Sequence, residues 1–242
     1  MSSRLAILAL ILAVVCAVAA VASGLGYRFG IWDLDIGFGM LQWSAYGAVA
    51  AAVLAVVAAI LTSPRHGRRG FAAAAVALLV AAPVFGYPLY MLRQASHAPN
   101  IHDITTDPDN PPPFVAILPL RASAPNSAQY QGASVATQQR RAYPAIRPFD
   151  SSAPPDVAFA RALAVARDMG WQIVADVPAQ GRIEATDTTR WFGFKDDIVV
   201  RVTPRPGGSR VDVRSESRVG TGDIGTNARR IDRYLHALSQ AT

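Results

Sequence analysis

The pattern of apolar positions divides the chain into two parts. Long apolar runs occupy residues 5–22, 44–61 and 71–92, whereas the apolar stretches that follow are short and interleaved with polar residues. At a rise of about 1.5 Å per residue, a run of this length comes close to crossing a hydrocarbon core about 30 Å thick. The pattern therefore predicts a region of three transmembrane helices over residues 1–93, followed by a soluble part.

Arginines between the second and third runs predict how the chain faces the membrane. Arg65, Arg68 and Arg69 lie in that connection without an acidic neighbour, whereas the preceding connection carries Arg28 and two aspartates. Short connections rich in arginine stay in the cytoplasm. We therefore predict a multi-pass protein of the bacterial inner membrane, with a cytoplasmic N-terminus and a periplasmic C-terminal domain.

Residues 1–22 have a second interpretation, as a cleaved signal peptide. Arg4 precedes the apolar run, and three small residues, Ala20, Ala22 and Ser23, stand near its end. Cleavage would leave two spans and the same external location for the soluble part. Both interpretations make the lipid bilayer a partner of the protein.

Residues 94–154 are rich in proline and polar residues, which predicts an extended arm with little regular structure. Two short apolar pieces, 114–120 and 143–149, interrupt this arm. A flexible linker would lack such pieces. We therefore expect the arm to pack on the folded core that follows it.

Residues 155–242 carry the regular patterns of the soluble part. Pro155 suits a first helical turn, and apolar residues at helical spacing continue to Met169, before Gly170. Four stretches with a period of two follow, at 171–175, 182–188, 198–203 and 210–219. A helix with one apolar stripe spans 226–239. This order predicts an α+β domain of two layers, an antiparallel sheet of about four strands with two helices on one face.

The net charge of +6 does not indicate nucleic-acid binding. Of the 23 basic and 17 acidic residues, six arginines and two aspartates lie in residues 1–96, which leaves 17 basic and 15 acidic residues beyond them. Because the soluble part is nearly neutral, nucleic acid is excluded as a partner. Cys16 is the single cysteine, so the soluble part has no disulfide or thiolate metal site, and we predict no cofactor.

The last predicted strand places charged and small polar side chains on opposite faces. Arg214 and Arg218 alternate with acidic residues on one face, while Ser215 and Ser217 lie on the other. Two interpretations of the charged face stay open: a solvated face whose charges neutralise one another, or a surface whose arginines bind an anion. The serines are expected to satisfy backbone groups or Asp223 and not to act as nucleophiles.

A glycine-rich turn at 220–225 matches G-x-G-x-x-G between a strand and a helix. A dinucleotide site also needs a second parallel strand and a later acidic residue, which this stretch lacks. The helix N-terminus can instead bind an anion, with help from Arg229 and Arg230. Alternatively, Asp223 or Thr226 simply caps the helix.

Two groups of acidic residues are expected in turns or ion pairs. Asp196 and Asp197 follow the aromatic stretch 191–194. Neighbouring strand residues point to opposite faces, so these two can form a catalytic couple only if a turn brings them together. The aromatic side chains are expected to pack in the core, and contact with lipid or with a partner is the alternative. The other group, whose spacing fits no standard metal loop, consists of His102, Asp103, Asp107 and Asp109.

Several of these stretches together resemble a known family. They are Y-P-A-I-R-P at 143–148, F-K-D-D at 194–197, R-S-x-S-R-x-G at 214–220, D-x-G-x-N at 223–227 and R-I at 230–231. The pattern resembles the bacterial domain-of-unknown-function family fourteen ninety-nine. The resemblance implies that residues 94–242 form one family domain behind a membrane anchor. It implies no catalytic residues and little about function.

The leading hypothesis is a periplasmic domain that binds an anionic ligand or a protein partner at the cell envelope. The expected ligand-binding residues surround the last strand-to-helix junction: Arg214, Ser215, Ser217, Arg218, Asp223, Asn227 and Arg230. One alternative is an envelope hydrolase that uses Asp223 or the pair Asp196 and Asp197. Another is an accessory subunit of a larger membrane complex, packed through its Gly/Ala-rich helices.

Overall fold

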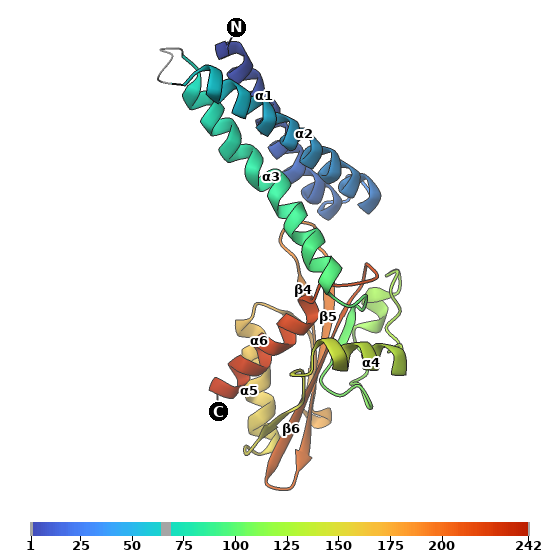
Figure 1. The fold of residues 1–242 in the computed structure, drawn as a ribbon. Coiled ribbons are helices and arrows are strands. Elements are labelled where there is room, and N and C mark those ends of the chain that lie inside the picture. The colour runs from blue at the N-terminus through green and yellow to red at the C-terminus, as the bar shows by residue number, and fades with distance from the viewer. Residues whose placement is uncertain (1, 64–68, 242) are drawn as a thin grey trace. The chain divides into compact units, whose positions relative to one another are not determined.

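The computed structural model describes residues 2–63 and 69–241 (Figure 1). Contacts divide the chain into two compact units. The first holds the residues up to 94 together with 190–193, and the second holds 95–189 together with the residues from 194 onward. A short segment far along the chain therefore belongs with the N-terminal helices.

Three long helices come first: α1 (Ser2–Arg28), α2 (Leu34–Leu61) and α3 (Phe71–His97). Each is long and apolar enough to span a membrane, which confirms the three predicted apolar helices. α2 begins at a cap, because the Asp33 side chain accepts a 2.9 Å hydrogen bond from the Ile36 N–H. Of the arginines on which the predicted orientation depends, Arg65 and Arg68 lie outside the described residues.

Small residues line the contacts among these helices. The buried ones are Ala9, Ala13 and Cys16 in α1, Ala48, Ala51 and Ala55 in α2, and Ala77 and Ala81 in α3. Alanine lets helix backbones approach closely, which favours helix association inside lipid. Many larger apolar side chains of the same helices are exposed instead. The Ala-rich faces are therefore used for packing within the bundle.

An antiparallel sheet of six strands forms the centre of the second unit. The strands are β1 (Asp103–Thr105), β2 (Phe149–Ser151), β3 (Gln172–Val177), β4 (Arg182–Thr188), β5 (Lys195–Arg205) and β6 (Gly208–Ser217). Their order is β1-β6-β5-β4-β3, and β2 also pairs with β6. The predicted α+β class is confirmed, but the expected count of about four strands is too low. β1 and β2 have three residues each, too few for a period of two to reveal them.

The arm before residue 155 also contains more regular structure than expected. Besides β1 and β2 it forms the 3-10 helix η2 (Leu118–Arg121) and the helix α4 (Ala133–Ala142). A further 3-10 helix, η3 (Pro178–Gln180), joins β3 to β4. Both short strands of the arm pair with β6, so the arm extends the sheet as well as packing on it.

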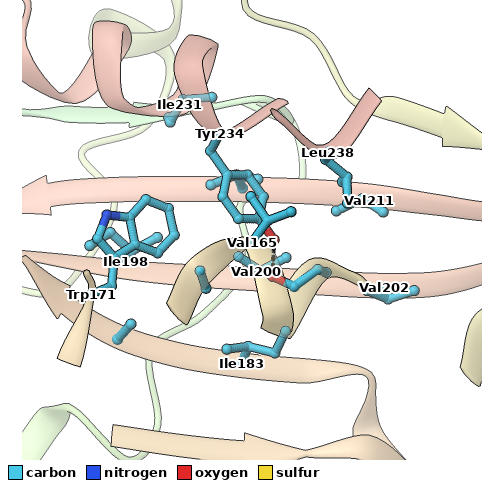
Figure 2. Packing of buried hydrophobic residues seen from close by; sticks show 14 of the residues in the cluster. Val165, Trp171, Ile183, Ile198, Val200, Val202, Val211, Ile231, Tyr234 and Leu238 are labelled. Atoms are coloured by element: carbon cyan, nitrogen blue, oxygen red, sulfur yellow. Dashed lines mark hydrogen bonds between the residues drawn. The ribbon is translucent and has the colours of Figure 1, made fainter. Parts of the chain in front are cut away.

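One face of the sheet carries α5 (Pro155–Asp168) and α6 (Thr226–Gln240), as predicted (Figure 1). Figure 2 shows the core beneath them, where the rings of Trp171 and Tyr234 stack with centroids 4.9 Å apart. The Tyr234 hydroxyl donates a 2.8 Å hydrogen bond to the Ala162 carbonyl oxygen. Apolar residues of β4 to β6 complete this core: Ile183, Ile198, Val200, Val202, Val211 and Val213.

The arm covers the other face of the sheet. Phe114 and Ile117 pack on Val199 of β5. Glu184 of β4 holds this segment, because its carboxylate accepts hydrogen bonds of 2.9 to 3.0 Å from three successive backbone N–H groups at 115–117. The middle of the charged face of β6 is buried, with Arg214 only 3% exposed. Its interpretation as a solvated face is therefore wrong.

Candidate functional site

The seven expected site residues do not converge on one point, because β6 separates them. Arg214 and Arg218 face the arm, whose carbonyl oxygens accept hydrogen bonds from both. The other five lie on the α6 side of the sheet: Ser215, Ser217, Asp223, Asn227 and Arg230. The structure thus contains two buried polar networks, one on each face of the sheet.

Asn227 is the centre of the network on the α6 side, and its side chain is fully buried. Its amide nitrogen donates to the Ser217 hydroxyl at 2.9 Å and to the His102 carbonyl oxygen at 3.0 Å. Its amide oxygen accepts from the Ser215 hydroxyl at 2.7 Å and from the Arg230 guanidinium at 2.5 Å. Both donors and both acceptor positions of the amide are thereby used within the protein.

Arg230 brings a buried positive charge into this network. Its Nε lies 2.9 Å from Asp187 and its Nη2 lies 2.6 Å from Asp196. A buried charge needs such partners, because its desolvation is otherwise too costly. Asp196 and Arg230 therefore neutralise each other inside the domain.

Asp223 caps the N-terminal end of α6. Its carboxylate accepts from the Gly225 N–H at 2.9 Å and from the Asn227 N–H at 2.5 Å. Burial raises the pKa of this carboxyl, and the two N–H donors oppose that change. The N-cap position itself is Gly225, and Asp223, two residues earlier, supplies the side-chain acceptor for the first turn. The place that an external anion would take at this helix end is held by the protein's own carboxylate.

Arg214 is the centre of the network under the arm. Its guanidinium forms a two-point contact with Asp103 at 2.9 and 2.8 Å and also donates to the Ala128 carbonyl oxygen at 2.8 Å. The guanidinium carbon lies 4.7 Å from the centre of the Phe114 ring. These contacts link β6 to β1 and to the arm at once.

Arg218 and Arg121 bind the next carboxylate along the same face. Arg218 contacts both oxygens of Asp197 at 2.8 Å. Arg121, from η2, lies 3.4 Å from Asp197 and 2.9 Å from Glu216. Asp196 and Asp197 thus face opposite sides of β5, each bound to arginine, as alternation predicts.

Glu216 is a buried acidic residue of this network whose pKa is raised. Its pKa is raised to about 8, chiefly by burial and then by Asp103, while Arg121 and Arg214 act in the opposite direction. The His102 Nε2 atom lies 3.9 Å from a Glu216 oxygen and has no hydrogen-bond partner among the described residues. Burial and Asp103 therefore oppose ionisation of Glu216, whereas the two arginines favour it.

Residues of the acidic cluster in the arm take separate roles. Asp103 belongs to β1 and pairs with Arg214, whereas Asp107 accepts from the Asn110 N–H at 3.1 Å in a turn. Asp109 pairs with Arg140. Within residues 2–63 and 69–241, no group of three or more His, Cys, Asp or Glu side chains could hold a metal ion.

A cleft of about 490 Å³ opens on the surface of the second unit. Its walls come from the turn after β1, the end of α4, the connection to β2 and one residue of β6. The lining residues are Thr106, Asp107, Pro108, Asp109, Gln139, Arg140, Tyr143, Pro144, Ile146, Arg147, Pro148 and Arg210. Sequence reasoning missed this cleft, although it singled out the stretch 143–148 that forms one wall.

Three arginines line the cleft, and they differ in how fully they are paired. Arg140 forms a 2.6 Å ion pair with Asp109, and Arg210 lies 2.9 Å from Asp107. Arg147 is exposed, and its Nε donates to the Pro144 carbonyl oxygen at 3.1 Å. Among the described residues it forms no ion pair with a carboxylate. Arg147 therefore presents a cation to the cleft.

The buried networks hold the walls of this cleft. The Gln139 side chain accepts from the Thr105 N–H at 3.0 Å and donates to the Thr105 carbonyl oxygen at 2.6 Å, which fixes α4 beside β1. Arg214 fixes the same strand through Asp103. Residues 106–109 follow directly, so the network under the arm positions one wall of the cleft.

Comparison with known families gives one match. Residues 103–238 match the sequence model of a family described as a protein of unknown function, DUF1499. The matched region contains the six-stranded sheet, both buried networks and the cleft. A search of curated proteins finds no match to this chain.

Proposed function

The chain belongs to the DUF1499 family, and from this premise we propose that its second unit binds a small anionic ligand in the cleft around Arg147. In this proposal, the three apolar helices anchor the protein in the bacterial inner membrane, and the second unit lies in the periplasm. Protein partners at the envelope are the alternative occupants.

The charge of the cleft carries the proposal. Three arginines and two aspartates line it, so the lining has one positive charge in excess. Arg140 and Arg210 are already paired with the aspartates, which leaves Arg147 for a ligand. A planar guanidinium matches carboxylate and phosphate groups with two parallel hydrogen bonds.

The size and the apolar part of the lining also support a small organic anion. A volume of about 490 Å³ lies within the range of small-molecule sites. Tyr143, Ile146 and Pro148 give the cleft apolar surface beside the arginines. This combination suits a ligand with one anionic group and a short apolar body.

The periplasmic location in the proposal depends on the arginine-rich connection between α2 and α3. Arg69 and the two preceding arginines have no acidic residue beside them, and such connections remain in the cytoplasm. A C-terminal alkaline phosphatase fusion tests this location, because the enzyme is active only outside the cytoplasm. An inactive fusion would remove the periplasmic placement.

In this proposal, the seven residues first expected to bind a ligand stabilise the domain that contains the cleft. Their hydrogen bonds hold the arm and α6 on the sheet, and ligand binding by these residues stays a prediction. The hydrolase alternative has less support, because Asp223 caps α6 while Asp196 and Asp197 are bound to arginines.

Titration calorimetry on the full-length protein in mild detergent tests the cleft. The probes are inorganic phosphate, glycerol phosphate and succinate, each at up to millimolar concentration. We expect at least one probe to bind the unchanged protein. Arg147→Glu should weaken that binding by roughly tenfold to a hundredfold, the value of a hydrogen bond to a charged group.

Arg141→Glu is the matched control, because Arg141 is exposed at the end of α4, shortly before Arg147, and does not line the cleft. It makes the same change of charge and should leave binding within about twofold, since only long-range charge is altered. Equal loss in both variants would indicate a non-specific charge effect. Absence of binding by every probe would remove the proposal.

A further inference from the structure

The connection between β4 and β5 contains a segment that packs with the N-terminal helices. Residues Arg190–Gly193 belong to the same compact unit as α1 and α2. The sequence here is Arg-Trp-Phe-Gly, and the sequence left two interpretations of its aromatic side chains, packing in the core or contact with lipid or a partner. We refer to these four residues as the anchor loop.

Trp191 forms a hydrogen bond to α1 and also packs against it. Its indole N–H donates a 3.1 Å hydrogen bond to the Val21 carbonyl oxygen. A Cβ atom at Gly24 would overlap the Trp191 ring and would lie 2.9 Å from the Phe192 ring. Gly24 therefore provides the space that lets the anchor loop reach the helix backbone.

Phe192 packs among aromatic side chains of α1 and α2. It is only 6% exposed, and its ring centroid lies 5.4 Å from that of Phe38 and 6.2 Å from that of Tyr27. The Arg28 guanidinium donates a hydrogen bond to the Arg190 carbonyl oxygen, which ties the backbone of the anchor loop to α1. Phe192 is thus enclosed, whereas Trp191 stays partly exposed.

The position of these contacts along the helices places them at a membrane boundary. Gly24 is 19 residues beyond Leu5, where the first apolar run begins, which corresponds to about 29 Å of helix. Trp191 also lies 5.9 Å from the ring of Tyr87, which is 16 residues, or about 24 Å, beyond Phe71. A hydrocarbon core is about 30 Å thick, so both contacts fall near its edge.

Aromatic residues on the same part of the bundle are exposed. Trp43 is 74% exposed, Tyr90 54% and Tyr87 49%. Tryptophan and tyrosine concentrate at the lipid headgroup level, where an apolar ring and a polar tip are both satisfied. The partly exposed Trp191, beside Tyr87, has the same chemistry.

We propose that the anchor loop is an interfacial membrane anchor. Trp191 lies at the level of the lipid headgroups and completes the aromatic belt of the three helices, while Phe192 locks the loop onto α1 and α2. The occupant of this surface is the bilayer itself. The proposal is independent of the ligand cleft, so either can fail without the other.

Fluorescence quenching in lipid vesicles tests this placement. The full-length protein and its Trp191→Phe variant are reconstituted into phosphatidylcholine vesicles whose acyl chains carry bromine near the headgroup. The difference between their emission spectra isolates Trp191 from Trp32, Trp43 and Trp171. We expect this component to be quenched by the brominated lipid more strongly than by acrylamide in the water.

A matched control moves the indole to a surface turn. Ala179→Trp in the Trp191→Phe background places it in η3, at an exposed position. This indole should be quenched by acrylamide and not by brominated lipid. If the Trp191 component instead behaves like this control, or if neither quencher reaches it, the anchor loop does not contact lipid and the proposal is overturned.

A second label keeps the test decisive if Trp191→Phe fails to fold. Arg190→Cys in a Cys16→Ala background carries a nitroxide spin label, and Ala179→Cys carries the control label. The label at 190 should collide more often with oxygen, which concentrates in lipid, than with a water-soluble nickel chelate. The reverse preference at 190 would contradict an interfacial position.

Discussion

Replacing Glu216 with glutamine should remove a large part of the pH dependence of stability. The Glu216 carboxyl has an ordinary pKa of 4.5, which burial, and then Asp103, raise to about 8 in the folded protein. Between these two values the folded protein retains a proton that the unfolded chain releases. Retention of this proton stabilises the folded protein fully at pH values below the pKa of the unfolded chain. This stabilisation is lost as the pH rises through the pKa of the folded protein.

The size of the effect follows from the two pKa values. Each unit of difference corresponds to about 1.4 kcal/mol, so Glu216 can account for a decrease of at most roughly 5 kcal/mol between pH 4.5 and pH 8. Glutamine resembles the protonated acid in shape. It keeps an oxygen for Arg121, whose Nη1 lies 2.9 Å from Glu216, and it cannot ionise.

Denaturant unfolding of the full-length protein in detergent, at several pH values from 5 to 9, measures this effect. We expect Glu216→Gln to match the unchanged protein near pH 5 and to be several kcal/mol more stable near pH 9. Asp150→Asn is the control, because Asp150 is an exposed partner of Arg205 and should leave the slope unchanged. Equal pH slopes for Glu216→Gln and the unchanged protein would refute the reasoning.

Three further substitutions test individual contacts. Asn227→Ala should lower the free energy of unfolding by roughly 2–5 kcal/mol in denaturant titration, because it removes buried hydrogen bonds to two serines, to Arg230 and to a backbone carbonyl oxygen. Tyr234→Phe should cost about 1 kcal/mol in the same assay, since one buried hydrogen bond to α5 is lost while the ring stacking remains. Gly24→Ala should destabilise the first unit by about 1–3 kcal/mol and shift the emission of Trp191, because the added methyl overlaps the indole. Gly39→Ala, in an open position, should be neutral or slightly stabilising, and equal effects of the two glycine variants would contradict the close packing.

Local sequence patterns were sufficient to predict the helices and strands whose apolar residues recur at a regular spacing. The apolar stripe of α6 was predicted from Ile231, Tyr234 and Leu238, and all three are buried. The hairpin between β5 and β6 has a local signal as well, because prolines and glycines stand at its turn and Gly207 there has a φ of 80°. Such features depend on neighbours within a few residues, so a single stretch of sequence contains them.

The candidate site could be predicted only in part. The residues of the strand-to-helix junction were expected to form one ligand site, but β6 divides them between two buried networks. The role of Asp223 at the start of α6 was one of two stated interpretations. Arg121 and Gln139 were missed, because both lie in an arm whose short elements have no clear period, and their partners are distant in the sequence. The cleft around Arg147 was missed for the same reason, since its walls come from four separate segments.

The sequence by itself determined the three apolar helices, the α+β class and the alternation of charged and small polar residues along β6. These properties follow from helix and strand periods and from the length of apolar runs. Only the tertiary structure decided that Arg214 is buried against Asp103, 111 residues away in the chain, under an arm that adds two strands to the sheet. The partner of a charge depends on which distant segments the fold brings together, and no local period encodes that choice.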